Sequence, residues 1–183
     1  MSPVTKKPRK PAVVRKRPVR PFFKVKTSRI EGRGAFAARL IRKGTRIIEY
    51  VGERITSAEA DARYDDANNL PHHTFLFALD NGTAIDAAYD GNDARFLNHA
   101  CEPNCEAVME GDRIFIESIK TIRVGEELVY DYRYMVDADF DEADLLAMYP
   151  CRCGRATCRG TIAIRQKKRA PRRRVAAKKR VLR

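Results

Sequence analysis

Three cysteines near the C-terminus have the spacing of metal ligands. Cys151-x-Cys153-x4-Cys158 supplies three thiolates, and Cys105 is the natural candidate for a fourth. Four thiolates around Zn²⁺ form a closed structural site with no position left for water. Such a site would contribute folding energy directly and would fix the C-terminal segment against the loop of Cys105. The alternative is a set of small, buried, apolar cysteines, and we expect the remaining Cys101 to be a buried thiol rather than a ligand or a nucleophile.

Three other short segments carry residues suited to a binding or catalytic site. Tyr130 and Tyr132 alternate, so a strand would place both rings on one face, although a tyrosine pair beside a core would look the same. Asn98-His99 is a polar turn whose histidine could equally be a hydrogen-bonded core residue. The glycine turn Glu31-Gly-Arg-Gly34 would let backbone approach a ligand closely, but a plain hairpin has the same use for glycine. These residues by themselves leave both interpretations open.

Together, the order and spacing of three segments resemble the SET-domain protein lysine methyltransferases that carry a zinc-binding post-SET segment. The segments are Asn92–Cys105, Gly125–Tyr132 and Cys151–Cys158. Small bacterial-type SET proteins, with little beyond these two parts, look most similar. The resemblance covers about residues 22–164 and implies S-adenosylmethionine as methyl donor and one structural zinc per chain. It implies a β-rich SET fold of small curled sheets. In that fold the Asn98-His99 and Tyr130–Tyr132 segments meet in a pseudoknot, which is an exception to the rule against threaded chains.

The resemblance also implies a role for each matched residue. Tyr132 matches the catalytic tyrosine, and Tyr130 matches the Phe/Tyr position that sets how many methyl groups are added. The residues matched to cofactor binding are Gly32, Arg33, Gly34, Phe75, Asn98 and His99. Two positions depart from the pattern. Phe75 stands where many relatives have a tyrosine that contacts the cofactor, which puts one hydrogen bond in doubt, and Ala100 stands where serine is frequent.

The chemistry of methyl transfer suits these residues. Transfer from a sulfonium is an in-line displacement, so the lysine amine must be deprotonated and aimed at the methyl carbon. A free lysine with a pKa of about 10.4 is neutral in roughly one molecule in a few thousand at pH 7. The site must therefore release a proton to water and then hold the amine dry and aligned. Positioning and desolvation should provide most of the acceleration, without a covalent intermediate.

Charge divides the chain into a globule and two arms. Residues 1–21 hold eight Lys or Arg, residues 165–183 hold eleven, and neither stretch contains an acid. The part between them keeps 18 bases against 24 acids, so an acidic globule of net charge −6 lies within a chain of +13. We expect a disordered basic arm at 1–21, a SET domain at 22–134, an acidic connector at 135–150, a post-SET zinc segment at 151–164 and a disordered basic tail at 165–183.

The arms favour a polyanionic partner. Basic, disordered segments attract nucleic acid through counterion release without reading sequence. Solubilising tails and nuclear import signals are the alternatives. No apolar run approaches the ~18 residues of a membrane span, and the N-terminus lacks the apolar segment of a signal peptide. We expect an intracellular, soluble, chromosome-associated protein, in a bacterial nucleoid or cytoplasm or in a nucleus, where five cysteines would not form disulfides.

The periodicity of apolar residues predicts a mostly β globule. Thr56-Ser-Ala-Glu59 has the pattern of a helix capping box, and Asn81-Gly82 between two apolar runs is typical of a type I′ hairpin turn. Gly111-Asp112 predicts a second hairpin. The expected elements are strands at 23–28, 35–40 and 46–55, a helix at 57–68, and hairpins at 75–86 and 106–117.

These observations predict a methyltransferase acting on lysines in basic protein tails, such as histone-like, nucleoid or ribosomal proteins, and mainly monomethylating. The alternative is a non-catalytic, basic, DNA-associated protein whose SET core only binds lysine-bearing tails. The intact Tyr132 and Asn98-His99 argue against the alternative. The target lysine, the host and the oligomeric state do not follow from the residues.

Overall fold

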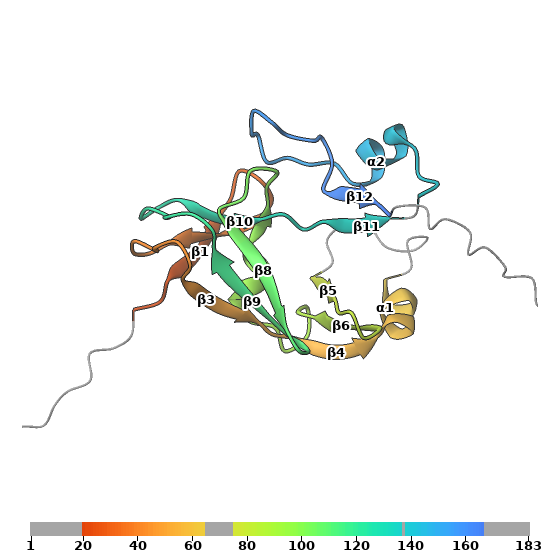
Figure 1. The fold of residues 1–183 in the computed structure, drawn as a ribbon, viewed down its shortest axis with the longest axis horizontal. Coiled ribbons are helices and arrows are strands. Elements are labelled where there is room, and N and C mark those ends of the chain that lie inside the picture. The colour runs from red at the N-terminus through yellow and green to blue at the C-terminus, as the bar shows by residue number, and fades with distance from the viewer. Residues whose placement is uncertain (1–19, 65–74, 137, 167–183) are drawn as a thin grey trace, which may run out of the picture.

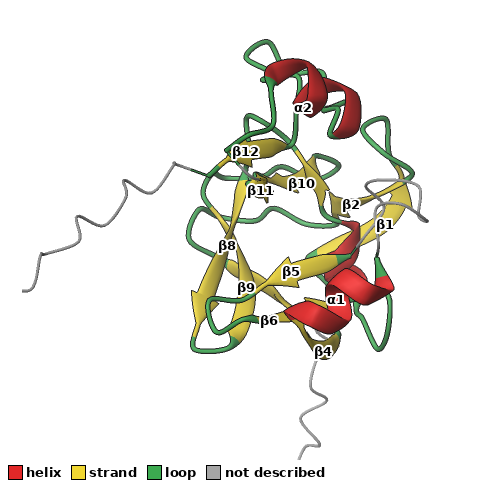
Figure 2. Cartoon of the chain, turned by 90° about the vertical axis from the view of Figure 1, so that its right-hand side faces the viewer, coloured by secondary structure: helices red, strands yellow, loops and turns green. Residues whose placement is uncertain are grey.

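The computed structural model describes residues 20–64, 75–136 and 138–166. Most of the basic arms, at 1–19 and 167–183, and the segment 65–74 lie outside the described residues, so the expected disorder of the arms stays a prediction. Within the described part the chain consists of short strands with few helices, as the periodicity predicted (Figures 1 and 2). No helix in this part is long and apolar enough to cross a membrane.

Four small sheets form the framework. The first has the order β1-β2-β10-β7, the second β3-β9-β8, the third β4-β6-β5, and the fourth pairs β11 with β12. Helix α1 lies beside β4 and β6, and α2 lies with β11 and β12 at the top of both views (Figures 1 and 2). The strands are β1 (Phe23–Thr27), β2 (Arg33–Ala37), β3 (Arg46–Tyr50), β4 (Glu53–Thr56), β5 (Leu76–Ala78), β6 (Thr83–Asp86), β7 (Asn98–His99), β8 (Cys105–Glu110), β9 (Arg113–Ser118), β10 (Glu127–Tyr130), β11 (Tyr134–Val136) and β12 (Ala163–Arg165), and the helices are α1 (Ser57–Arg63), α2 (Glu142–Met148) and the 3₁₀ helix η1 (Asp93–Phe96).

The strand expected at 46–55 is broken into β3 and β4. The two halves pair with different sheets, β3 with β9 and β4 with β6. Gly52 lies at the break, where a side-chain Cβ would come within 2.5 Å of the carbonyl oxygen of Asp86. Only glycine allows the two backbones to approach this closely, so this residue makes the change of sheet possible.

Helix α1 begins as the sequence predicted. The Thr56 side chain accepts a hydrogen bond from the Glu59 amide, and the Glu59 carboxylate accepts one from the Thr56 amide, which completes the capping box. At its other end Arg63 donates to the fully buried Asp86 (2.7 Å), and the Tyr64 hydroxyl donates to the same carboxylate (2.8 Å). The buried charge is thereby compensated, and α1 is fixed to β6.

The hairpin at Asn81-Gly82 forms, but its turn is not type I′. A type I′ turn needs positive φ at both central residues. Gly82 has φ +78°, whereas Asn81 is not among the residues of positive φ. The Leu79 amide instead bonds the Thr83 carbonyl across a longer loop, and the Asn81 side chain accepts from the Thr83 amide. The second hairpin, β8–β9, turns at Gly111-Asp112 as expected.

The main core lies between the first two sheets and the loops that join them. Its fully buried members are mostly aliphatic and come from strands and from the loops between them. They include Ile41, Leu97, Ile114, Ile116, Ile122 and Leu128. Beside this core, β7 pairs in parallel with β10, with Val129 opposite Asn98 and Tyr130 opposite His99. The expected meeting of these two segments is therefore present.

Candidate functional site

A cavity of about 380 Å³ opens where β7, the end of β10, the turn after β1 and the C-terminal segment come together. This volume is in the range of small-molecule and cofactor pockets. Five of the six residues expected to bind a cofactor line it, and so does Tyr132. The lining residues are Ile30, Glu31, Gly32, Arg33, Phe75, Arg95, Phe96, Asn98, His99, Tyr132, Pro150, Arg152 and Ile162. Residues 150–162 form the C-terminal segment of this cavity. Sequence reasoning assigned none of them to a cofactor site, because only the folded chain brings them to the cavity.

Gly34 is the expected cofactor residue that does not line the cavity. A Cβ at this position would lie 2.2 Å from Oε1 of Glu127 and 2.9 Å from Cβ of Ser28. The glycine therefore makes room for the Glu127 carboxylate beneath the turn. Its function in this structure is close packing, and any contribution to a ligand site is indirect.

Glu127 is a site residue that sequence reasoning missed. Its Oε1 accepts hydrogen bonds from the Ser28 hydroxyl and from the Asn98 amide, both at 2.8 Å. The same Asn98 amide group lies within hydrogen-bond distance of the Glu31 and Arg33 carbonyl oxygens, at 3.2 and 3.0 Å. Asn98, held by Glu127, thus fixes the 31–33 turn that lines the cavity. The sequence did contain a sign of this role, because Glu127 is a charged residue at the start of an otherwise apolar strand, β10.

His99 is buried and neutral. Burial lowers its pKa to about 4, although the neighbouring Asp131 carboxylate opposes the shift. Its Nδ1 accepts a hydrogen bond from the Tyr132 amide (3.2 Å), which places the ring proton on Nε2. Nε2 lies 3.5 Å from Sγ of Cys101. One imidazole therefore joins the backbone of Tyr132 to a cysteine.

The two tyrosines lie side by side, as their alternation predicted. Their ring centroids are 4.8 Å apart, and the Tyr130 ring also stacks near Phe77 at 6.5 Å. The Tyr132 hydroxyl donates to the Leu97 carbonyl oxygen (2.9 Å). Burial raises the pKa of both tyrosines well above the ordinary value. Both hydroxyls stay protonated at neutral pH, so they can donate hydrogen bonds but cannot act as bases there.

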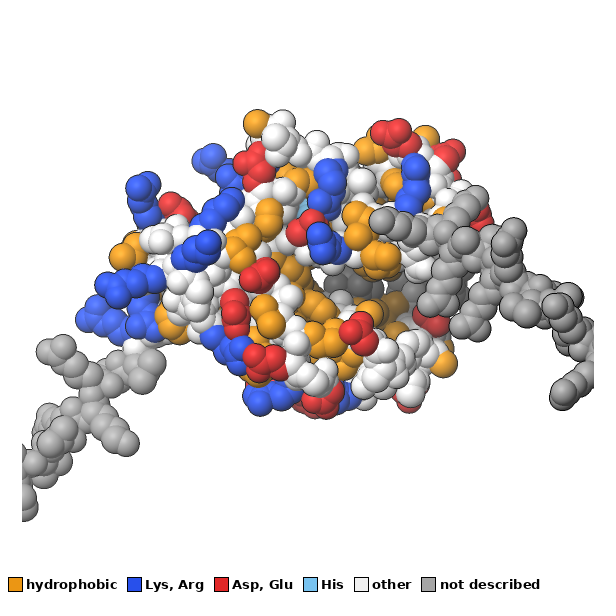
Figure 3. Space-filling view, viewed as in Figure 1, with side chains coloured by type: hydrophobic (Ala, Val, Ile, Leu, Met, Phe, Trp, Pro, Cys, Tyr) orange, Lys and Arg blue, Asp and Glu red, His pale blue; other side chains and the backbone are white. Residues whose placement is uncertain are grey.

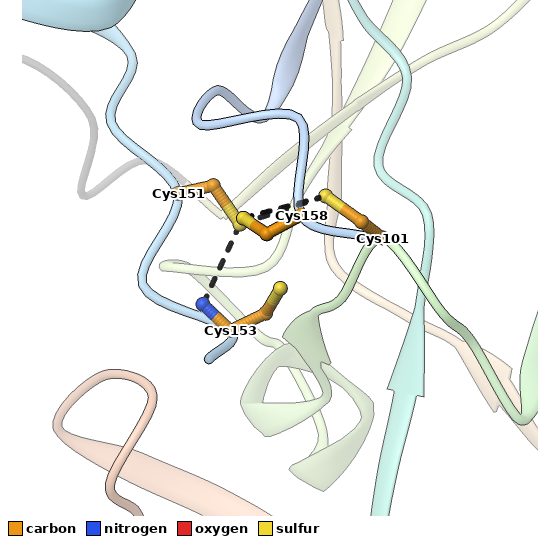
Figure 4. A group of neighbouring side chains, drawn as sticks. All are labelled: Cys101, Cys151, Cys153 and Cys158. Atoms are coloured by element: carbon orange, nitrogen blue, oxygen red, sulfur yellow. Dashed lines mark hydrogen bonds between the residues drawn. The ribbon is translucent and has the colours of Figure 1, made fainter. Parts of the chain in front are cut away.

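Four cysteines form a compact cluster, and its fourth member differs from the expected one. The sulfur atoms of Cys101, Cys151, Cys153 and Cys158 all lie within 4.8 Å of one another (Figure 4). Cys105 is absent from this group. It is 1% exposed on β8, opposite Ser118, and belongs to the main core. The correction has a simple cause. Cys105 lies in a strand, whose pairing with β9 turns its side chain into the core, whereas Cys101 lies in the loop before it.

The donor set of this cluster suits a metal. Four sulfur donors are what a closed structural zinc site uses, and the sulfur atoms are close enough to share one ion. All five cysteines are free thiols. The cluster packs beside Ala100 and Val129, directly behind the strand pair that carries Asn98 and Tyr130. A metal here would stabilise the C-terminal segment that closes one side of the cavity.

A bidentate ion pair connects the same segment to the strand of the tyrosines. Arg159 donates from both terminal nitrogens to the Asp131 carboxylate, at 2.8 Å each, and Asp131 stands between Tyr130 and Tyr132. The Arg159 amide also lies 3.4 Å from Sγ of Cys101. About a third of the Arg159 side chain is exposed, but the paired geometry is stronger than that of a single surface contact.

This ion pair gives a testable expectation. Arg159→Ala should increase amide hydrogen exchange in residues 130–136, because the strand is then no longer bonded to the cysteine segment through this side chain. If the cavity is catalytic, turnover should fall about tenfold, as expected for a charge-assisted bond of this kind. Arg155→Ala is the matched control, since Arg155 is exposed in the same segment and forms no salt bridge in the described part of the chain. Equal exchange and turnover in the two variants would contradict the coupling.

Comparison with known proteins gives one family and several similar sequences. A family model described as SET domain matches residues 32–133. A histone-lysine N-methyltransferase of Mycosarcoma maydis, H3 lysine-4 specific, is 40% identical over 144 residues, which are 75% of this chain and 9% of that protein. The protein of the same description from Schizosaccharomyces pombe is 41% identical over 140 residues, 73% of this chain and 14% of that protein. Human histone-lysine N-methyltransferase 2D is 39% identical over 136 residues, 72% of this chain and 2% of that protein.

Among solved structures, the chain is similar to ctPRC2 in an autoinhibited conformation bound to S-adenosylmethionine. The TM-score is 0.54 at 35% sequence identity, and the match covers 60% of this chain and 15% of that chain. All four of these similar proteins are much longer, so this chain spans 2 to 15% of their length.

Proposed function

We propose, since the chain belongs to the SET-domain family, that it is an S-adenosylmethionine-dependent protein lysine N-methyltransferase. The observation that carries the proposal is the meeting of Asn98, His99, Tyr132 and the 31–33 turn in one cavity. Relatives about 40% identical to this chain are described as histone-lysine N-methyltransferases, and a similar solved structure is described as bound to S-adenosylmethionine.

The cavity fits this cofactor in size and in chemistry. Bound S-adenosylmethionine supplies an electrophilic methyl group on a sulfonium. Phe75 and Phe96 offer apolar surface, while Arg33 and Arg95 offer cationic groups suited to a carboxylate. Arg152 is already paired with Glu31. Nε of Arg95 is buried without a hydrogen-bond partner in the described structure, so a polar group remains for a ligand to satisfy. We expect Asn98 to act by shaping the 31–33 turn, because its amide is already bonded to that turn.

The protein's own contribution to transfer is orientation and exclusion of water. The rings of Phe77, Tyr130 and Tyr132 pack against one another, and beside them an uncharged amine is favoured over an ammonium group. Neither Tyr130 nor Tyr132 is ionised at neutral pH, so the substrate must lose its proton to water before alignment. The Tyr132 hydroxyl and neighbouring carbonyl oxygens would then orient the neutral amine.

We also propose a structural zinc ion held by Cys101, Cys151, Cys153 and Cys158. The support is a set of four sulfur atoms that lie within 4.8 Å of one another. The ion would fix Pro150, Arg152 and Ile162 along the cavity, since these residues flank the cluster in the chain. Cofactor binding and metal binding would then depend on each other.

The proposed substrates are lysines in basic protein tails, such as those of histones, nucleoid proteins or ribosomal proteins. Between the arms the chain has 24 acids and 18 bases, and such a charge excess steers basic peptides. The acidic residues of the segment 137–144, before and at the start of α2, contribute to it: Asp137, Asp139, Asp141, Glu142 and Asp144. We propose that the protein acts at the chromosome, where histones and nucleoid proteins are found.

Product specificity should depend on Tyr130. A hydroxyl at this buried position can hold a water molecule where an already methylated amine would have to turn, which favours monomethylation. Tyr130→Phe should therefore shift the product toward dimethyl- and trimethyl-lysine with little loss of the first transfer. Mass spectra of a methylated peptide measure this shift. Trimethyl-lysine as the main wild-type product would contradict the expectation.

The basic arms should contact nucleic acid. Their 19 positive charges without an acid favour counterion release from a polyanion. We propose that they also compete weakly with substrate for the acidic surface. Deleting residues 1–21 and 165–183 should lower KM for a free peptide and weaken DNA binding, most strongly at low ionic strength. Unchanged KM and unchanged DNA binding at every salt concentration would show that the arms are only solvated tails.

One assay tests the main proposal. Purified protein is incubated with S-adenosylmethionine carrying a labelled methyl group and with mixed histones, bacterial nucleoid proteins and ribosomal proteins. Label should appear on lysine in at least one of these substrates. Binding of the same proteins without any transfer of label would support the non-catalytic alternative.

A further inference from the structure

One end of the folded part is built from three chain segments that backbone hydrogen bonds hold together. The start of the described chain joins the β2–β3 loop through the bond from the Ala38 amide to the Phe22 carbonyl oxygen (2.8 Å). The β2–β3 loop joins the β9–β10 loop through two reciprocal bonds between Ile41 and Ile122, at 3.0 and 2.8 Å. The bond from the Gly125 amide to the Ala37 carbonyl oxygen (2.8 Å) closes this arrangement. The surface is therefore a fixed one.

This surface is strongly cationic. We call it the cationic end, and it comprises residues 20–27, 38–44 and 119–126. These segments contain eight Lys or Arg and one acid, Glu126. Figure 3 shows Lys and Arg side chains gathered at the left of the molecule, over β1 and the loops beside it. The cations are Arg20, Lys24, Lys26, Arg39, Arg42, Lys43, Lys120 and Arg123.

The cations of this end lack the ion pairs that other arginines of the protein form. Within the described residues, none of the eight makes a salt bridge, whereas Arg46, Arg54 and Arg113 each pair with a carboxylate. The Arg39 guanidinium stacks on the Phe22 ring at 3.8 Å, and Lys26 lies over Phe36 at 5.8 Å. Within the described residues, neighbouring carboxylates therefore do not compensate the positive charge of this surface.

The charge is also divided unevenly over the globule. Of the 18 bases and 24 acids in residues 22–164, the cationic end holds seven bases and one acid. The rest of the globule keeps 11 bases against 23 acids, a net charge of −12. A field of this asymmetry orients the molecule in front of a polyanion, with the acidic remainder directed away from it.

We propose that the cationic end is a docking surface for duplex nucleic acid. Duplex DNA presents one phosphate charge per ~1.7 Å of axis, a density that several lysines and arginines on one rigid surface can neutralise together. The chain also enters this surface directly from residues 1–19, which hold seven further bases and no acid. The sequence therefore adds positive charge directly before the folded surface. This inference does not depend on the proposed catalytic activity.

The test uses the full-length protein and a fluorescent DNA duplex of random sequence. Arg42, Lys43, Lys120 and Arg123 are replaced together by alanine, and binding is measured by anisotropy between low and physiological salt. All four side chains are exposed and lie away from the cavity. The slope of log affinity against log salt should become shallower by about 0.9 for each phosphate that the variant no longer neutralises, so by up to about 3.6. Affinity at low salt should fall more than about tenfold.

The matched control removes the same charge elsewhere. It replaces Arg46, Arg54, Arg113 and Arg155 by alanine, four exposed arginines outside the cationic end. Its affinity for duplex should fall less than about threefold, and thermal melting checks that both variants fold. Equal losses in the two variants would show that only net charge matters and would overturn the proposal. So would an unchanged affinity in the first variant, or polyglutamate of matched charge binding as tightly as the duplex and losing affinity equally, since the partner would then be an acidic protein.

Discussion

Tyr132→Phe should lower turnover by about 10²–10³-fold while leaving the cofactor Kd within about twofold of the wild-type value. The substitution keeps the ring that packs against His99 and Tyr130 and removes one oxygen. Tyr132 lines the cavity, and its hydroxyl, which donates to the Leu97 carbonyl oxygen, is the group that we expect to orient an amine during transfer. The effect should therefore fall on kcat rather than on binding. Single-turnover transfer to a peptide and calorimetric titration of the cofactor measure the two quantities.

Tyr50→Phe is a closely matched control for this substitution. The Tyr50 hydroxyl is buried and donates to a backbone carbonyl oxygen, that of Phe75 (2.7 Å), in the same way that Tyr132 donates to Leu97 (2.9 Å). Each variant loses one such bond, at about 1 kcal/mol of stability. Tyr50 does not line the cavity, and its variant should keep turnover within about threefold. Similar turnover in both variants would assign Tyr132 a structural role only.

Cys101→Ser should remove most of the bound metal, and Cys105→Ser should not. The first variant loses a donor of the four-sulfur cluster and should release zinc to a chelator far more readily than the wild type. Turnover should fall with metal content, because the C-terminal segment supplies part of the cavity wall. Metal analysis after dialysis against a chelator, with the turnover of the same samples, gives both quantities.

Cys105→Ser should change stability instead. Cys105 is 1% exposed in the main core, and a hydroxyl introduced there without a partner costs about 1–3 kcal/mol. The variant should melt earlier with a full complement of metal. The reverse pattern, with metal lost from Cys105→Ser and kept by Cys101→Ser, would contradict the assignment of the fourth ligand.

The sequence alone predicted the features that depend on neighbouring residues. The capping box of Thr56 and Glu59, the β8–β9 hairpin and the mainly β character all follow from local patterns, since the interacting groups are a few residues apart. The spacing of Cys151, Cys153 and Cys158 brought three sulfur atoms together for the same reason. The resemblance of the Asn98 and Tyr132 segments to a known family correctly indicated that they meet, although 34 residues separate them.

Only the tertiary structure decided which distant group completes each site. Cys101 and Cys105 are both about 50 residues from Cys151, and spacing cannot distinguish them. The pairing of β8 with β9 decided the choice, because it turns Cys105 into the core. Gly34 and Gly52 are likewise required by distant groups. A Cβ at Gly34 would meet the Glu127 carboxylate, and one at Gly52 would meet the backbone of Asp86. The cationic end arises in the same way, where three loops meet through backbone bonds that no local pattern encodes.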